Sequence, residues 1–359
     1  MDFQLTDEQR LIRDSAVRLV QENASADRGP DHLWQSLFDS GYLSLLVPAA
    51  HGGSGLGFLE AGLVLEALGA TLVATPYCTS AVVAADWLRR HGSASQQELW
   101  LPRMASGEVI AAPLLRYDGS SAYGEPRPGG IRVSGHSAPV SMGSTADIYL
   151  VEIAPRRPGE NLAVIVERSQ PGVVVEDLAL PDLTRLSASV TLTEVEVTED
   201  RIMRRCDGRW LWSAAAACKA AEMLGGAGQA LEIAAAYARE RKQFGVPIGS
   251  FQGIKHMLAD QVVMLEGTRS AVYAALWALD NDPARAECSC ALAKLKANEC
   301  YTKTAGESIQ IHGALGFSEE ALPHRYLKRA LVDSHLFGTA EAHLGTLADN
   351  LEQFSLPQN

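Results

Sequence analysis

The chain has 359 residues, of which 47% are hydrophobic and 21% charged, and its formal net charge is −12. A chain of this length exceeds one small core, so we expect two or three structural units in an ordinary globular protein. Nucleic-acid binding requires clustered basic residues, and the acidic balance therefore argues against a nucleic-acid partner.

Six cysteines are dispersed along the chain, and the sequence does not start with a secretory pattern, so we expect reduced thiols and a cytoplasmic protein. Cys288 and Cys290 are separated by one residue and no second pair follows, a spacing that does not predict a metal site. The uncharged run over residues 67–85 is interrupted by Gly69 and Pro76, which indicates a buried helix and loop and no membrane span.

The first part of the chain is predicted to be a helical domain over residues 1–108. Thr6 and Gln9 have the spacing of a capping box, in which each side chain satisfies a free backbone N–H at a helix start. Apolar residues then recur at helical spacing in four further segments, residues 34–46, 58–69, 80–90 and 97–104.

A glycine-rich run over residues 47–57 includes Gly53 and Gly55. A dinucleotide-binding turn needs a strand before it and a helix after it, and the preceding segment here has helical periodicity. The run is therefore predicted to be a loop between two helices.

The period changes after residue 108, and residues 109–203 are predicted to form a middle domain built as a small β-sheet or barrel. Short alternating or apolar runs bounded by Gly and Pro indicate strands at residues 131–134, 147–153, 162–167, 172–177 and 186–197. Residues 118–130 are rich in Ser, Gly and Pro, and we expect a flexible loop there.

Residues 204–359 are predicted to be a C-terminal helical bundle. Helical periodicity runs through residues 210–243, 252–279, 283–311, 322–336 and 339–351. Gly225, Gly226 and Gly228 interrupt the first of these helices and leave room for a neighbouring backbone to pack closely.

Two motifs of the bundle make the sequence resemble the acyl-CoA dehydrogenase family. The first is an Arg-x-x-Phe-Gly element followed by Phe-Gln and Leu-Ala-Asp, carried here by Arg241, Phe244, Gly245, Phe251, Gln252, Leu258, Ala259 and Asp260. The second is similar to the family's Gln-x-x-Gly-Gly-x-Gly-Phe element and is carried by Gln310, Gly313, Gly316 and Phe317. The resemblance spans almost the whole chain and implies a mostly α fold in three parts, an N-terminal helical domain, a β middle domain and a C-terminal four-helix bundle.

The resemblance also implies FAD, an acyl-CoA substrate and a glutamate that removes the substrate's α proton in an apolar cleft. The base of most members precedes a Gly-Thr pair, and here Phe337 stands before Gly338 and Thr339. The position used by a minority of members corresponds to Ala215. His335 and Glu341 flank the first position and are weak substitutes, so no catalytic residue is assigned.

The residues that resemble the family's clamp on the diphosphate half of a neighbour's FAD are retained. They comprise Arg241, Phe244, Gln310, Gly313 and Gly316. Gln252 and Thr339 are further residues that the resemblance assigns to FAD binding. The segments that contact the isoalloxazine ring in the family are less well retained. Residues 112–121 keep a remnant of the family's Thr-Glu-Pro segment. Residues 139–142 stand where the family has Trp-Ile-Thr-Asn, and Ser141 is the one hydroxyl among them.

This pattern predicts the base-lacking subunit of a heterotetrameric α2β2 acyl-CoA dehydrogenase acting on bulky, steroid-derived CoA thioesters. A paralogous partner would carry the glutamate, and an acceptor such as electron-transfer flavoprotein would take the electrons. Two alternatives remain open: a self-sufficient flavoenzyme of the same fold with monooxygenase or lyase chemistry, and a non-catalytic binding subunit.

Overall fold

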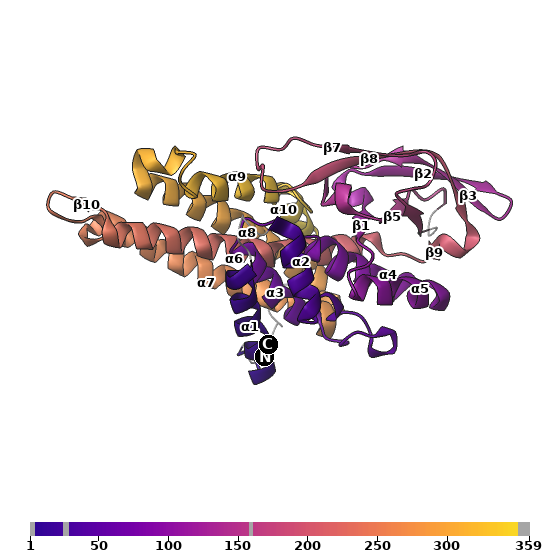
Figure 1. Ribbon diagram of the computed structural model, residues 1–359, viewed down its shortest axis with the longest axis horizontal. Helices are drawn as coiled ribbons and strands as arrows, with labels where there is room; N and C mark the ends of the chain where they lie inside the picture. The colour runs from indigo at the N-terminus through magenta and orange to yellow at the C-terminus, as the bar shows by residue number, and fades with distance from the viewer. Residues whose placement is uncertain (1–3, 24–28, 158–160, 351–359) are drawn as a thin grey trace. The chain divides into compact units, whose positions relative to one another are not determined.

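The computed structural model describes residues 4–23, 29–157 and 161–350 (Figure 1). The chain forms two compact units. The bundle unit consists of Met1–Val17, Gly62–Leu72 and Ala216–Asn359, and the sheet unit consists of Arg18–Ala61 and Val73–Ala215. Each unit is therefore assembled from segments that lie far apart in the sequence.

The first part of the chain is helical, as predicted. Its helices are α1 (Asp7–Asn23), α2 (Gly29–Asp39), α3 (Phe58–Gly69), α4 (Ala85–His91) and α5 (Ala94–Ala105), with a wide helical turn at Tyr77–Ala84 before α4. The capping box forms: the Thr6 N–H donates to Gln9 Oε1 at 3.0 Å, and the Gln9 N–H donates to Thr6 Oγ1 at 3.2 Å. The expected helix over residues 34–46 is wrong in its extent, because α2 ends at Asp39 and Gly41 then adopts a φ of 76°.

The glycine-rich run is a loop between α2 and α3, as predicted. Residues 42–44 and 49–51 form single 3-10 turns, and the Gly55 N–H donates to Val47 O at 2.9 Å. A Cβ at Gly53 would lie 2.0 Å from Val47 O. The close packing of this turn against Val47 therefore accounts for the glycine at residue 53, and a dinucleotide phosphate is not needed to explain it.

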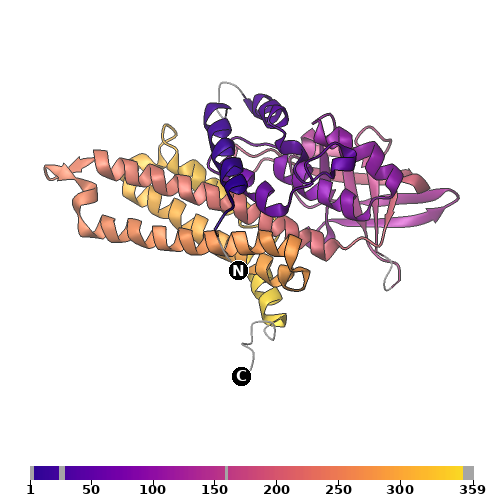
Figure 2. The ribbon, with the colours of Figure 1, turned by 90° about the horizontal axis from the view of Figure 1, so that it is seen from below.

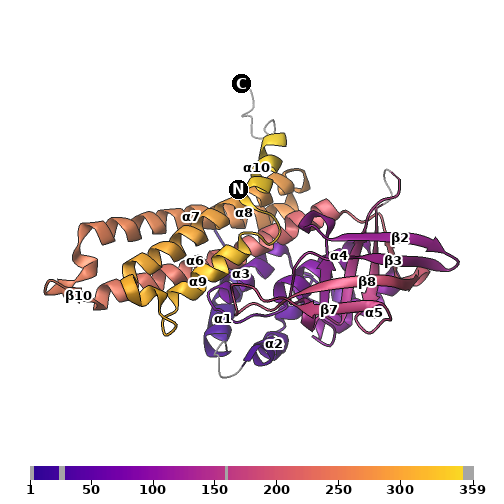
Figure 3. The same ribbon diagram turned by 90° about the horizontal axis from the view of Figure 1, so that it is seen from above.

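The sheet unit contains two sheets (Figure 3). One has the order β1-β5-β6-β9 and is built from Ala111–Leu114, Ile148–Ile153, Leu162–Glu167 and Ile202–Arg204. The other has the order β2-β3-β8-β4, with β7 also paired to β8, and is built from Ser121–Arg127, Gly130–His136, Ser187–Thr198, Val140–Ser141 and Val173–Asp177. Side chains of both sheets, including Tyr149, Val164, Val133 and Val190, are fully buried in one hydrophobic core.

The loop expected over residues 118–130 is wrong for most of its length. Residues Ser121–Arg127 form β2, which pairs with β3 in antiparallel register from Ser121 opposite His136 to Arg127 opposite Gly130. β2 is the edge strand of its sheet. An edge strand tolerates Pro and Gly because one side of its backbone needs no ladder hydrogen bonds, so Pro126 and Gly124 do not prevent pairing.

The bundle is built from α6 (Gly208–Glu240), α7 (Gln252–Asn281), α8 (Pro283–His312), α9 (Pro323–Asp333) and α10 (Ala340–Asp349) (Figure 2). A short hairpin of β10 (Lys242–Gln243) and β11 (Val246–Pro247) joins α6 to α7 and lies at the tip of these two helices (Figure 1). The predicted helices agree with these bounds to within a few residues. Leu351, the predicted end of the last helix, lies outside the described residues.

Close approach between α3 and α6 explains one of the three bundle glycines. A Cβ at Gly225 would lie 1.9 Å from the backbone oxygen of Glu66, whereas at Gly226 it would meet the Tyr301 ring and at Gly228 it would have only an ordinary contact at 3.9 Å. The predicted backbone approach is therefore confirmed at Gly225 alone. In the described ranges of the chain, no helix is both long enough and apolar enough to span a membrane.

Candidate functional site

The hairpin end of the bundle carries most of the residues expected to hold the cofactor. The Arg241 N–H donates to Tyr237 O, and the Ile248 N–H donates to Arg241 O, both at 2.8 Å. These bonds fold the hairpin tightly onto the end of α6. Ala234 and Ala238 of α6 pack there with Ile311 of α8, in a small hydrophobic cluster. The ends of α6 and α8 therefore lie together, which brings Arg241 and Gln310 to the same end of the bundle.

Arg241 is exposed, and its guanidinium forms no ion pair or hydrogen bond with any described residue. Arg239, two residues earlier, contrasts with it: its guanidinium binds Glu232 at 2.9 Å and the Ala235 carbonyl at 3.1 Å. Glu240, the residue next to Arg241, is therefore not its ion-pair partner. The Arg241 guanidinium therefore keeps its charged N–H donors available, since no described group of the bundle unit accepts from them.

Phe244 has an unusual conformation at the hairpin tip. Its side chain is 94% exposed and its φ is 52°, in the left-handed region that a bulky residue rarely adopts. Its ring meets Phe251 edge to face, with the centroids 6.2 Å apart. An exposed phenyl ring on a strained backbone contributes little to the stability of this chain. Such outliers are typical of sites that bind a ligand or a partner.

The end of α8 contributes Gln310, Gly313 and Gly316. Gln310 is exposed, and Gly313 follows the helix with a φ of 61° and open space where a Cβ would be. Gly316 is buried, and a Cβ there would lie 2.7 Å from Ile309 O, so its glycine is explained by packing on α8. Gln252, the first residue of α7, is also exposed.

Neither expected base position holds an ionisable side chain, and both are buried. Phe337 is 6% exposed and Ala215 is fully buried. Phe337 lies in the connection between α9 and α10 with a φ of 55°, and Gly338 follows with a φ of 106°. The backbone conformation at residue 337 is therefore strained, although no carboxylate is presented from it.

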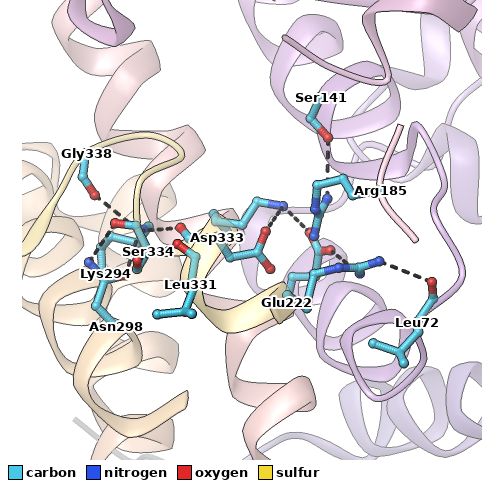
Figure 4. A network of polar contacts seen from close by, with 12 residues as sticks. Leu72, Ser141, Arg185, Glu222, Lys294, Asn298, Leu331, Asp333, Ser334 and Gly338 are labelled. Atoms are coloured by element: carbon cyan, nitrogen blue, oxygen red, sulfur yellow. Dashed lines mark hydrogen bonds and ion pairs between the residues drawn. The ribbon is translucent and has the colours of Figure 1, made fainter. Parts of the chain in front are cut away.

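Buried polar side chains hold this connection in place, and Figure 4 shows Lys294 and Asn298 beside Gly338. Lys294 of α8 is fully buried and its ammonium donates to Asn298 Oδ1 at 2.7 Å, to Asp333 O at 3.0 Å and to Gly338 O at 3.2 Å. His343 of α10, also fully buried, donates from Nε2 to the backbone oxygen of Phe337 at 3.0 Å. Burial, reinforced by the Lys294 charge, lowers the pKa of His343 to about 4, so the imidazole is neutral at pH 7.

A second polar network lies on α6 and α9. The Lys219 ammonium binds the Glu222 carboxylate and lies 3.8 Å from Asp333 Oδ1. Arg329 lies 3.9 Å from Glu222 Oε1 and donates to Leu72 O at 3.1 Å. Asp333 is therefore part of a network with buried cations, and it is not a free carboxylate that could act as a base (Figure 4).

The two weak substitutes for the base are both on the surface of the chain. His335 and Glu341 are exposed, so neither has the apolar surroundings that make a carboxylate an effective general base. Glu341 lies in the first turn of α10, where a negative charge stabilises the helix. Thr339 is the N-cap of α10, and its hydroxyl oxygen accepts from the Ala342 N–H at 3.3 Å.

Ser141, the one hydroxyl expected on the isoalloxazine side, lies in β4 opposite Ser187 of β8 and is buried. Its hydroxyl accepts a long hydrogen bond from Arg185 Nη1 at 3.4 Å. Ser141 therefore belongs to the sheet unit, whereas the hairpin-end residues belong to the bundle unit. Its hydroxyl oxygen already has a hydrogen-bond donor within the sheet unit.

The sequence reading missed Lys294, Asn298 and His343. A signal was available for the first two, because Lys294 and Asn298 lie four residues apart on an alanine-rich face of α8 whose neighbours Ala291 and Ala297 are buried. Nothing in the local sequence indicates that the Lys294 ammonium reaches backbone oxygens about 40 residues away.

Comparison with known proteins agrees with this architecture. Models of the acyl-CoA dehydrogenase N-terminal and C-terminal domains match residues 6–108 and 213–352. Acyl-CoA dehydrogenase FadE27 of Mycobacterium tuberculosis is 33% identical over 337 residues, covering 89% of this chain and 88% of the relative. Acyl-CoA dehydrogenase IpdE2 of Mycolicibacterium smegmatis is 28% identical over 96% of this chain and 98% of its own length.

Solved structures of similar fold include the ChsE4–ChsE5 complex of Mycobacterium tuberculosis, with a TM-score of 0.92 and 30% identity over 99% of this chain and all of the other. The Tcur3481–Tcur3483 steroid ACAD has a TM-score of 0.87 at 27% identity, covering 97% of this chain and 98% of the other. The prediction of a helical, β and helical fold is thereby confirmed. On this combined evidence, the chain belongs to the acyl-CoA dehydrogenase family.

Proposed function

We propose that this chain is the base-lacking subunit of a heteromeric, FAD-dependent acyl-CoA dehydrogenase. The observation that carries the proposal is the pair of buried apolar residues, Phe337 and Ala215, at the two positions where the family's base is expected. Neither side chain can accept a proton. A paralogous partner chain would supply the carboxylate, and the two chains would assemble as α2β2.

The proposed reaction removes two hydrogens from adjacent carbons of an acyl-CoA thioester. A carboxylate of the partner takes the α hydrogen as a proton, and the β hydrogen leaves with its electron pair, so that a C=C bond forms. FAD held here and by the partner would supply the acceptor for that hydride, and a separate acceptor such as electron-transfer flavoprotein would take up the electrons. This chain contributes binding and orientation to the reaction and no proton transfer.

The exposed hairpin end fits the diphosphate half of a neighbour's FAD. Arg241 offers charged donors that no described carboxylate satisfies, which suits a pyrophosphate. Gln310 offers an exposed amide beside Gly313, where no side chain obstructs an approaching ligand. Phe244 offers an apolar ring that is 94% exposed in this chain. A partner that covers this ring would recover the free energy of burying it.

Binding of the isoalloxazine half is proposed to come mainly from the partner. Ser141 is buried and accepts from Arg185 at 3.4 Å. The remnant segment after β1 turns away through Arg116–Asp118, and Asp118 accepts from the Trp212 indole at 3.3 Å. The groups that remain on this side thus have partners within the sheet unit. This favours one FAD per pair of unlike chains.

The substrate class and partner are proposed by analogy with relatives. Similar structures include a complex of two unlike chains, ChsE4–ChsE5, and a steroid ACAD. We therefore propose a bulky, steroid-derived acyl group and a paralogous subunit as partner. The six cysteines all lie in the described residues, are buried and form no disulfide, and this supports the cytoplasmic location that we propose.

The test is the visible spectrum and acyl-CoA dehydrogenase activity of the chain produced alone and together with its paralogue. We expect flavin absorbance and turnover only in the co-purified complex. Arg241→Ala should weaken FAD binding by about ten- to a hundredfold, since it removes a charge-assisted contact. Arg239→Ala is the matched control, because this neighbouring arginine is bound to Glu232 and should not affect the cofactor.

A yellow lone chain that turns over a thioester would overturn the proposal in favour of a self-sufficient enzyme. His335 and Glu341 would then be the first residues to substitute. Relatives with other chemistry exist, including the 3-sulfinopropanoyl-CoA desulfinase of Paraburkholderia xenovorans at 26% identity over 94% of this chain. A complex that forms but binds no flavin would instead indicate a non-catalytic binding subunit.

A further inference from the structure

Tyr237 and His312 form an aromatic contact between the ends of α6 and α8. Their rings are stacked, with centroids 4.2 Å apart and an angle of 22° between the planes. His312 is 8% exposed, and its Nδ1–H donates to Ser308 O at 2.7 Å, which fixes the ring plane against its own helix. The pair joins the end of α6 to the end of α8.

The ring pair differs from the other contacts at these helix ends in having a preferred geometry. The local cluster contains Ala234, Ala238 and Ile311, with Tyr237, Ile248, Ile254, Met257 and Leu258 packed against it. Aliphatic contacts are non-directional, whereas stacked rings have a preferred separation and orientation. The Tyr237–His312 pair therefore restricts the position of the α6 end against the α8 end.

Each residue of the ring pair is close along the backbone to a residue that the proposed function uses. The Arg241 N–H donates to Tyr237 O at 2.8 Å, so Arg241 lies one helical turn beyond the tyrosine. Gln310 and Gly313 flank His312 in sequence. A change in the stack would therefore move the Arg241 side of the site relative to the Gln310 side. Among the described residues, the Arg241 and Gln310 side chains form no hydrogen bond or ion pair that would restrain them, and both are exposed.

We propose that Tyr237 and His312 are positioning residues of the FAD-binding end, setting the separation at which Arg241 and Gln310 engage opposite sides of the same diphosphate. This inference rests on the proposed function, in which the hairpin end holds part of a neighbour's FAD. The two rings act through Arg241 and need not touch the cofactor. Binding sites of this kind lose affinity when the supporting contacts are loosened by a fraction of an ångström.

The test is a double-mutant cycle on the dissociation constant of FAD from the assembled complex, combining Tyr237→Leu with Arg241→Ala. In the background with Arg241, Tyr237→Leu should weaken FAD binding by roughly five- to tenfold. In the Arg241→Ala background it should change binding by less than about twofold, because the residue that it positions is gone. His312→Phe, which keeps an aromatic ring, should retain most of the affinity that His312→Ala loses.

Tyr273→Leu is the matched control. Tyr273 lies in the same bundle unit but donates to Glu66 at 2.7 Å, about 20 residues along α7 from the hairpin. It should lower the melting temperature and leave the FAD dissociation constant unchanged.

Equal weakening by Tyr237→Leu in both backgrounds would mean that the stack contributes only general stability, which overturns the inference and leaves the proposed function standing. No effect in either background would overturn it in the same way. If Arg241→Ala does not weaken FAD binding, the proposed function fails and the inference fails with it.

Discussion

Replacing Lys294 by Met tests whether the buried ammonium holds the connection between α9 and α10. Met has nearly the volume of the lysine stem, so the change removes charge and donors and leaves no large cavity. Three acceptors then lose their donor: Asn298 Oδ1 at 2.7 Å, Asp333 O at 3.0 Å and Gly338 O at 3.2 Å. Asn298 can turn its amide to another group, but the two backbone oxygens stay where the chain puts them.

The expected cost follows from those contacts. A hydrogen bond to a charged group contributes about 1.5–3 kcal/mol, so three of them sum to about 4.5–9 kcal/mol. Removing the ammonium also removes its own burial penalty of several kcal/mol. When the lost hydrogen bonds are offset by the removed burial penalty, the net destabilisation should be about 3–5 kcal/mol. Lys296→Met on the same helix is the control, because its ion pair with Glu299 at 3.1 Å is exposed and should contribute less than about 0.5 kcal/mol.

The assay is equilibrium urea unfolding of the two variants and the parent chain, followed by circular dichroism. If the Lys294 variant unfolds within about 1 kcal/mol of the Lys296 variant, the ammonium does not hold the connection and the assigned contacts are not what stabilises it. A variant more stable than the parent would lead to the same conclusion, since the burial penalty would then exceed the three hydrogen bonds.

Three further predictions concern the glycines of α6, the two strained phenylalanines and the buried histidine. Gly225→Ala should destabilise the chain by more than about 2 kcal/mol, because its Cβ would lie 1.9 Å from the α3 backbone. Gly228→Ala should instead stabilise it by up to about 1 kcal/mol through helix propensity. Thermal melts of both variants check this, and equal effects would contradict it. Phe337→Gly should lower the unfolding free energy by about 2–3 kcal/mol, because a buried ring is lost. Phe244→Gly should lower it by less than about 0.5 kcal/mol, because the Phe244 ring is exposed and backbone strain is relieved. Similar losses of unfolding free energy in urea would argue against this difference in burial. His343 has a folded pKa of about 4 against 6.5 unfolded, so the unfolded state binds more protons between these pH values. Stability should therefore fall by up to about 3 kcal/mol as the pH drops from 6.5 to 4. When unfolding free energy is measured against pH, this slope should be absent in His343→Gln.

The helices and most strands could be predicted because their signals are local. The apolar period of α7 and α8, the capping box at Thr6 and the alternation in β8 each depend on residues within one element. The pairing of β2 could not be predicted in this way, because its Gly and Pro content is typical of a loop. Only its position at the edge of a sheet makes those residues acceptable.

The sequence itself decided that neither expected base position holds an ionisable side chain, since Phe337 and Ala215 cannot ionise in any fold. The tertiary structure decided which polar groups are engaged and which are free to bind. It ties Lys294 to backbone oxygens of the α9–α10 connection, stacks Tyr237 on His312, and pairs Arg239 while leaving Arg241 without a described partner. These contacts join residues tens of positions apart. Local periodicity reports which face of an element is apolar, whereas the partner of a given side chain depends on how separate elements pack.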